Sequence, residues 1–330
     1  MAKERRLYPL VFAPIYKDKI WGGDKIRSVL GKDYGDLPNC GESWEVSAVP
    51  GQVSVVAEGP LKGRDLSWLI GEYGAELLGE SVFGKYGAEF PLLVKFISAA
   101  DDLSIQVHPD DAMAAKYHGG FGKTEMWYVL DADPGAELIY GFDREMTREM
   151  YLEYFHAGRL EELLRRVPVK KGDCFFLPPG RVHSIGRGIL LAEIQQSSDI
   201  TYRIYDFDRV DAGGRKRELH VELALEAMDF SVPEETGNRR AILPGVYTEL
   251  AACPYFSTGI VRADRATGRD FSSTDSFVVF TCTAGAADVV TESGSVAMRV
   301  GVCVLLPASI RRVEVRPADG GVEWLETVAR

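Results

Sequence analysis

Short apolar segments, separated by glycine and proline, dominate the chain. They are rich in Val, Ile and Phe, a composition typical of β-strands that pack in stacked sheets. We expect strands at 52–57, 91–97, 126–130, 174–177 and 277–281. The chain is therefore predicted to be mainly β.

Helical periodicity is confined to three segments. We expect helices at 112–117, 144–167 and 217–228. The first follows Asp110, a residue type that caps helix N-termini, and the second is interrupted at Gly158. In the third, Leu219, Leu223 and Ala227 would share one face. Helices are thus predicted to interrupt a β-rich chain.

One short pattern occurs twice along the chain. Gly172–Pro178 consists of a turn glycine, five strand residues and a proline, and Gly301–Pro307 repeats it. Upstream, Met126–Leu130 has a counterpart in Ser276–Phe280. Forty-four residues separate Tyr128 from Gly172 but only 23 separate Val278 from Gly301, and the excess of 21 is close to the length of the second helical segment.

The repeat predicts two related β-units. We expect the first at 1–230, with a helical insertion at about 144–167, and the second at 245–330. The segment Ser231–Pro244, with its prolines and glycine, would separate them. A length of 330 residues with 46% hydrophobic residues is enough for two domains of roughly 150 residues each.

The net charge of −11 disfavours nucleic acids and anionic membrane surfaces as partners. Two short basic clusters, Lys3–Arg6 and Arg215–Arg217, lack the interleaved aromatic residues of a single-strand binder. Five widely spaced cysteines without a Cys-x-x-Cys pair argue against a disulfide framework and a thiolate zinc site. No apolar run is long enough to cross a bilayer, and the N-terminus does not resemble a signal peptide. We expect a cytoplasmic protein, and the sequence leaves its oligomeric state, monomer or dimer, open.

The first copy of the repeat continues into Gly180 and His183. The spacing Gly-x5-Pro-x-Gly-x2-His resembles the second motif of the cupin superfamily, in which the histidine binds a metal and the strands form a jelly roll. Arg187 stands where that motif usually has an asparagine. In the second copy, Arg312 occupies the histidine position, so only one metal is expected.

Other candidate ligands lie upstream. Gln106 and His108 are two residues apart, so on a strand both side chains point to the same face. Glu125 opens the next apolar strand and could add a carboxylate. With His183 they form an amide, two imidazoles and one carboxylate, a set suited to zinc, with iron or manganese possible. Without a thiolate, the expected site keeps an open coordination position.

Seven segments extend the resemblance from a superfamily to a family. They are Trp21–Gly23, Gly41–Glu45, Phe90–Lys95, Leu103–Asp110, Gly122–Met126, Gly172–His183 and Gln196–Arg203. In these segments the chain resembles the type I mannose-6-phosphate isomerases, particularly the short bacterial form. The resemblance covers most of residues 8–230 and is faint beyond Pro244.

The resemblance implies that Gln106, His108, Glu125 and His183 bind zinc. It also implies that Lys123, Asp199 and Arg203 lie in or beside the active site. These three residue types suit the interconversion of mannose 6-phosphate and fructose 6-phosphate, because an enediol intermediate needs a base and a cation for its negative charge.

The individual roles stay open at this stage. Either Lys123 or Asp199 could transfer the proton, and Lys123 could instead bind phosphate. Arg203 could bind phosphate or the enediolate, or form a structural ion pair with Asp199. Lys95 and Ser104 are further candidates for contact with the phosphate of a small sugar-phosphate substrate.

Two other functions are compatible with parts of the pattern. An iron-dependent cupin oxygenase also uses two histidines and a carboxylate. A non-catalytic cupin that senses sugar phosphates would keep the pocket without turnover. The amide ligand, together with the cations at positions 123 and 203, favours the isomerase.

Overall fold

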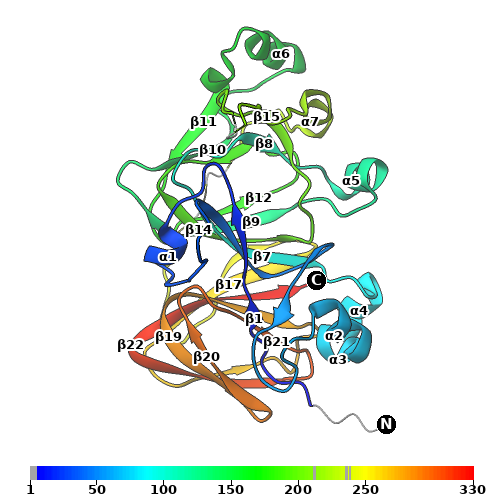
Figure 1. Cartoon of the computed structure of the whole chain (residues 1–330), viewed down its shortest axis with the longest axis vertical. Helices are drawn as coiled ribbons and strands as arrows, with labels where there is room; N and C mark the ends of the chain where they lie inside the picture. Colours follow the sequence, from blue (N-terminus) through cyan, green and yellow to red (C-terminus); the bar gives the residue numbers. More distant parts are fainter. Residues whose placement is uncertain (1–5, 211–212, 235–236, 238) are drawn as a thin grey trace.

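The computed structural model describes residues 6–210, 213–234, 237 and 239–330. Figure 1 shows two β-units along the long axis of the molecule, with most of the first above the second. Of the expected basic cluster at positions 3–6, only Arg6 lies within the described residues.

The first unit contains two antiparallel sheets. The six-stranded sheet consists, in spatial order, of β12 (Cys174–Leu177), β9 (Glu125–Ala132), β14 (Ile189–Gln196), β7 (Leu92–Ser98), β3 (Cys40–Val46) and β2 (Ile15–Asp18). The five-stranded sheet consists of β11 (Leu164–Pro168), β10 (Glu137–Phe142), β13 (His183–Ile185), β8 (Ile105–Val107) and β15 (Tyr202–Tyr205). Side chains such as Trp127, Val129 and Leu138 pack between the two sheets.

The second unit is built from one large antiparallel sheet. It consists of β16 (Thr248–Ala252), β17 (Phe256–Ala263), β22 (Arg312–Ala329), β19 (Val278–Thr291) and β20 (Gly294–Arg299), with β18 (Thr267–Asp270) on β22 and β21 (Cys303–Leu306) on β19. Its interior is filled with apolar side chains, among them Phe280, Val304 and Trp324. The mainly β, two-unit cupin-like fold is confirmed.

The two units repeat the same strand order. The order β12-β9-β14-β7 in the first unit matches β21-β19-β22-β17 in the second. Cys174 pairs with Tyr128, and the equivalent Cys303 pairs with Thr281. The internal repeat in the sequence matches Tyr128 with Val278, whereas the structure matches it with Thr281, three residues further along the chain. An apolar run alone does not fix the register of a strand.

The six-stranded sheet is buried on both faces, so β7 and β14 are buried along their whole length. Its outer face, which includes Phe96 and Tyr128, packs against Phe256, Phe277 and Leu325 of the second unit. Burial on both faces explains why these strands read as continuous apolar runs instead of alternating ones.

Three helices, α5 (Asp111–His118), α6 (Arg148–His156) and α7 (Val221–Ala227), cover the outer face of the five-stranded sheet. The helices α1 (Lys25–Ser28), α2 (Leu66–Tyr73), α3 (Ala75–Leu78) and α4 (Glu80–Tyr86) instead contribute to the core that the six-stranded sheet shares with the second unit. Residues of α5, α6 and α7 pack against β8, β10 and β15 (Figure 1). The expected helix at 112–117 is confirmed as α5, and the Asp110 side chain accepts a hydrogen bond from the backbone NH of Met113.

The expected helix at 144–167 is only partly correct. It ends as α6 at His156, because Gly158 adopts a left-handed backbone with φ 68°. A short 3₁₀ helix at Leu160–Leu163 follows, and residues 164–168 then form β11, which pairs with β10. The third helix is shorter than expected, and Leu219 lies before it and is 40% exposed.

Two other sequence expectations require correction. The strand expected at 52–57 is divided between two small sheets, β4 (Ala48–Val49) with β5 (Gln52–Val53), and β1 (Phe12–Ala13) with β6 (Val55–Val56). Helices α2, α3 and α4 were not predicted, because repeated glycines interrupt their apolar pattern.

We propose that the domain boundary lies at 231–244, as expected from the sequence. Helix α7 ends at Ala227 and β16 begins at Thr248. The N-terminal segment crosses this division, because Leu10 exchanges two backbone hydrogen bonds with Leu305, each 2.8 Å long. All five cysteines are free. Among the described residues, no helix is long and apolar enough to span a membrane.

Candidate active site

The four expected metal ligands come together between the two sheets of the first unit. Glu125 begins β9 in the six-stranded sheet, whereas Gln106 in β8 and His183 at the start of β13 belong to the five-stranded sheet. His183 and Gln106 are direct neighbours in the β13–β8 pairing, and His108 follows β8. Antiparallel register thus brings together residues up to 77 positions apart in the sequence.

The polar atoms of these side chains face one another. Glu125 Oε1 lies 3.3 Å from His183 Nε2, and Glu125 Oε2 lies 3.7 Å from His108 Nε2. The amide nitrogen of Gln106 lies 3.3 Å from His183 Nε2. One ligand atom from each of His108, Glu125 and His183 falls within 4.8 Å of the others, so the three can hold one metal ion.

Backbone carbonyls fix the tautomers of both histidines. His108 Nδ1 donates to the carbonyl of Ile200 at 2.9 Å, and His183 Nδ1 donates to that of Arg181 at 2.8 Å. Each Nε2 therefore presents a lone pair to the centre of the site. Burial, followed by the nearby Lys123, lowers the pKa of His108 well below its usual value, and burial lowers the pKa of His183 to about 4. Both rings are neutral at neutral pH, as metal ligation requires.

Glu125 indicates that the site is built for a cation. Its carboxylate is fully buried, and Oε1 accepts no hydrogen bond within the described part of the chain. Burial and repulsion by Glu193 raise its pKa. A buried oxygen without a hydrogen-bond donor is costly, and a metal ion would offset this cost. The nitrogen and oxygen donors fit a zinc-type site.

Lys123 lies beside the metal ligands. Its Nζ is 2.9 Å from Glu125 Oε2 and 3.1 Å from His108 Nε2. It is also 3.6 Å from Glu193 Oε1, which in turn is 2.9 Å from the Nζ of Lys95. Lys95 and Lys123 hold the pKa of Glu193 low despite its burial. The site therefore contains a buried chain of alternating charges.

Glu193 was not predicted as a site residue. A signal was present, because it is the single charged residue within the apolar strand β14. Its Oε2 accepts a hydrogen bond of 2.9 Å from Trp127 Nε1. Glu42 also lines the cavity, on β3, and accepts a hydrogen bond of 2.6 Å from Trp44 Nε1. Glu42 lies in the family segment Gly41–Glu45, but the sequence indicated no role for it.

A cavity of about 100 Å³ lies beside this site, and of the four expected metal ligands only Gln106 lines it. It is lined by Lys19, Trp21, Glu42, Lys95, Ile97, Leu103, Ser104, Gln106, Lys123, Ile185, Glu193, Thr201, Arg203 and Arg217. Arg203 donates to Ser104 Oγ at 3.3 Å and to the Glu218 carbonyl at 2.9 Å. Asp199 is exposed and does not line this cavity. Of the expected catalytic and substrate-binding residues, the structure thus brings Lys95, Ser104, Lys123 and Arg203 together.

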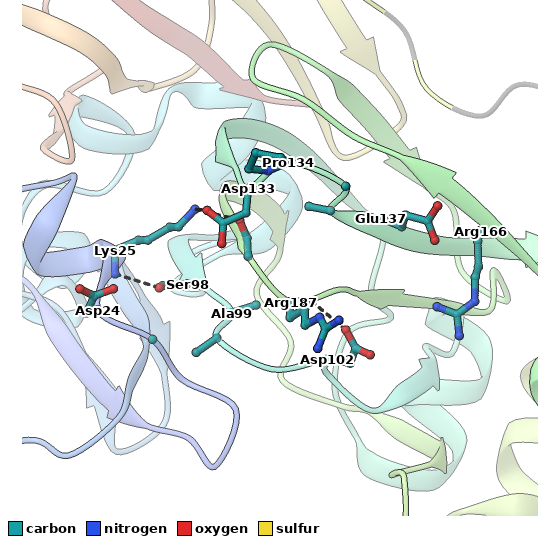
Figure 2. A pocket seen from close by; sticks show the side chains of 15 residues that line it. Asp24, Lys25, Ser98, Ala99, Asp102, Asp133, Pro134, Glu137, Arg166 and Arg187 are labelled. Atoms are coloured by element: carbon teal, nitrogen blue, oxygen red, sulfur yellow. Dashed lines mark hydrogen bonds and ion pairs between the residues drawn. The ribbon is translucent and has the colours of Figure 1, made fainter.

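A larger cavity, of about 690 Å³, lies at the other end of β9 (Figure 2). None of the expected site residues lines it. Its most buried cation is Lys25, whose Nζ lies 2.7 Å from Asp131, 2.8 Å from Asp133 and 2.8 Å from the Gly188 carbonyl. Lys25 thereby holds α1 against the end of the barrel. The candidate chemistry therefore lies in the smaller cavity.

Comparison with known proteins shows which family the chain resembles. Residues 10–135 match the family described as phosphomannose isomerase type I, catalytic domain. The mannose-6-phosphate isomerase of Streptococcus mutans is 39% identical over 96% of this chain and 96% of its own. A mannose-6-phosphate isomerase of Bacillus subtilis is 44% identical over 76% of this chain and 78% of its own.

The fold comparison agrees. A crystal structure of the mannose 6-phosphate isomerase from Bacillus subtilis superimposes with a TM-score of 0.81, covering 97% of this chain and 99% of its own at 31% identity. The similarity extends through both β-units. The chain therefore belongs to the type I phosphomannose isomerase family.

Proposed function

We propose that the protein is a zinc-dependent aldose–ketose isomerase that interconverts mannose 6-phosphate and fructose 6-phosphate. The observation that carries this proposal is the convergence of two neutral histidines and Glu125 on Lys123, which itself lines a cavity together with Gln106 and Arg203. Family relatives named as mannose-6-phosphate isomerases support the choice of substrate.

Gln106, His108, Glu125 and His183 are the proposed zinc ligands. The bound ion would hold and polarise the oxygens of the sugar next to the reacting carbons. The fixed histidine tautomers and the buried carboxylate supply three strong donors. Rotation of the Gln106 amide by half a turn would present its oxygen as the fourth.

Isomerisation moves a proton from C2 to C1 of the open-chain sugar. We propose Lys123 as the group that transfers it, because its amine lines the cavity and its side chain is only 5% exposed. Asp199 was the alternative, and its exposed position outside the cavity supports the lysine instead.

Negative charge develops on the substrate oxygens in the enediolate, and the phosphate carries further charge. Arg203 is proposed to stabilise one or both of these charges, with Ser104 as its hydrogen-bond partner. Lys95 lies in an ion pair with Glu193, so its proposed contribution is to fix that carboxylate and to add positive potential to the cavity.

The proposal is tested by an assay in which the formation of fructose 6-phosphate from mannose 6-phosphate drives a measurable colour change. The assay is run with and without a chelator. We expect turnover of mannose 6-phosphate that the chelator abolishes and added Zn²⁺ restores. Oxygen uptake by the iron-loaded protein would favour an oxygenase instead. Sugar-phosphate binding by the zinc-loaded protein without any turnover would favour a sensor.

The role of Lys123 has a test of its own. Lys123→Ala should lose exchange of the C2 proton, and an unchanged exchange rate would exclude Lys123 as the base.

A further inference from the structure

Arg217 lines the active-site cavity, although the sequence considered it only as part of a basic cluster. Its side chain is 26% exposed, so it lies at the open side, whereas Lys123 is 5% exposed in the interior. A substrate with its reacting carbons near Lys123 would extend toward this open side. Arg217 therefore lies where the far end of the sugar would be.

A buried carboxylate holds Arg217 in place. Asp206 follows β15, and its side chain is 6% exposed. Arg217 Nε donates to Asp206 Oδ2 at 2.7 Å, and Arg217 Nη2 donates to Oδ1. Arg209 Nη2 donates to the same Oδ1 at 2.7 Å. Because Asp206 uses only Nε and Nη2 of Arg217, Nη1 has no partner within the described part of the chain.

The backbone beside Asp206 is unusual. Phe207 and Asp208, with φ of 55° and 54°, are the only non-glycine residues at positive φ in the described part of the chain. Left-handed backbone is unfavourable for residues with a Cβ, and it persists where the surrounding contacts determine it. The Asp206 contacts thus fix the guanidinium of Arg217 next to this turn.

The charges of this cluster do not balance. Arg209 and Arg217 contact a single buried carboxylate, Asp206, and Arg203 lies nearby; Glu218, the other acidic neighbour of Arg203, is exposed, so the buried and half-buried groups carry an excess of about two positive charges. Asp101, 3.3 Å from Arg209, is 59% exposed and hence screened by water. Burial and the repulsion from Arg217 lower the pKa of Arg203, as expected for a positive potential. A phosphate monoester dianion matches this excess.

We propose that Arg217 binds the phosphate group of the substrate together with Arg203, and that Asp206 positions Arg217 for this contact. The inference rests on the proposed function in so far as the substrate is a sugar phosphate. Arg203 Nη2, like Arg217 Nη1, has no partner within the described residues, so each guanidinium can donate to a phosphate oxygen.

The test compares steady-state kinetics of zinc-loaded wild-type enzyme and Arg217→Ala. We expect the KM for mannose 6-phosphate to rise by about tenfold to a hundredfold, the range for loss of a hydrogen bond between charged groups. The kcat should change by less than about threefold, since the reacting carbons lie elsewhere. The inhibition constant of inorganic phosphate should rise with KM, and Arg217→Lys should restore part of both.

Asp206→Asn tests the positioning role. It keeps the shape of the side chain and removes its charge, so we expect a smaller rise in KM at an unchanged kcat. Arg269→Ala is the matched control, because Arg269 also forms two hydrogen bonds of 2.8 Å to a buried carboxylate, Glu326, but lies on β18 of the second unit. Its KM and phosphate inhibition should equal those of wild type.

The outcomes separate this inference from the proposed function. An active wild type whose KM and phosphate inhibition are the same in Arg217→Ala overturns the inference alone, as does an equal effect in Arg269→Ala. If the wild type shows no isomerase activity, the proposed function fails. Calorimetric titration with inorganic phosphate then decides the inference, because binding that Arg217→Ala abolishes supports it and equal binding by both proteins refutes it.

Discussion

The buried carboxylate of Glu193 offers the sharpest test of how the site is held together. Glu193→Gln keeps the shape of the side chain, and its amide oxygen can still accept the hydrogen bond from Trp127. The change removes the negative charge that faces Lys95 at 2.9 Å and Lys123 at 3.6 Å. We expect the protein to fold but to lose stability.

The size of this loss follows from the distances. At an effective dielectric constant near 20, a pair of charges 2.9 Å apart attracts by about 6 kcal/mol. Lys123 keeps Glu125 as a partner, and Lys95, left with only the weaker attraction of Glu42, can release its proton, which at pH 7 from the ordinary pKa of 10.5 costs about 5 kcal/mol. The destabilisation is therefore capped near that value, and we expect about 3–5 kcal/mol.

The assay is urea unfolding of the metal-free protein at pH 7, together with kcat/KM of the zinc-loaded enzyme. Glu45→Gln is the matched control, because Glu45 pairs with the buried Lys32 at 2.8 Å and does not line the cavity. Both variants should lose similar stability, but only Glu193→Gln should lose kcat/KM. A loss below about 1 kcal/mol in Glu193→Gln would refute the reasoning, since the lysines would then not depend on this charge.

Three further predictions concern other parts of the structure. Lys25→Ala should lower the free energy of unfolding by about 1–2 kcal/mol, since three contacts of Lys25 are lost at a side chain only 15% exposed, and an unchanged urea midpoint would contradict this. Gly186→Ala should cost at least about 2 kcal/mol, because its Cβ would lie 1.9 Å from the Glu137 carbonyl oxygen; a melting temperature equal to wild type would be incompatible with that packing. The arginine contacts lower the pKa of Asp206, so its stabilisation is complete above its ordinary pKa of 3.8 and is lost as pH falls through the lower folded value. Asp206→Asn should accordingly be less stable than wild type at pH 7, and this difference should shrink at pH 3; a constant difference would argue against the ion pairs.

The proximity of the proposed metal ligands could be predicted because their spacing follows strand geometry. The Gln106–His108 alternation and the glycine-bounded strand before His183 are local patterns, and each places a side chain on a known face. Glu193 was missed, because a charge inside an apolar run becomes interpretable only when its buried lysine partners are known.

Arg217 shows a different limit. Its position depends on a buried aspartate 11 residues away, and no periodic pattern encodes this contact. The helical stretch expected at 144–167, with its interruption at Gly158, failed beyond Leu163 because tertiary pairing is likewise not encoded in the local pattern. Residues 164–168 pair with β10, and these tertiary hydrogen bonds outweigh the local helical pattern.

The six-stranded sheet of the first unit, whose outer face packs against the second unit, limits which substitutions and truncations the chain can tolerate. Alternate residues of β9 point to opposite faces of the sheet. Glu125 and Trp127 point to the candidate active site between the two sheets, whereas Met126 and Tyr128 point to the second unit. The second unit has Val278 where the first has Glu125, so this position of its interior offers no carboxylate ligand. The interior of the second unit can therefore change without loss of a metal ligand. A truncation before Thr248, however, would expose the outer face of the six-stranded sheet to water. The second unit, which lacks the metal ligands, thus covers the apolar outer face of the sheet that carries Glu125 in the first unit.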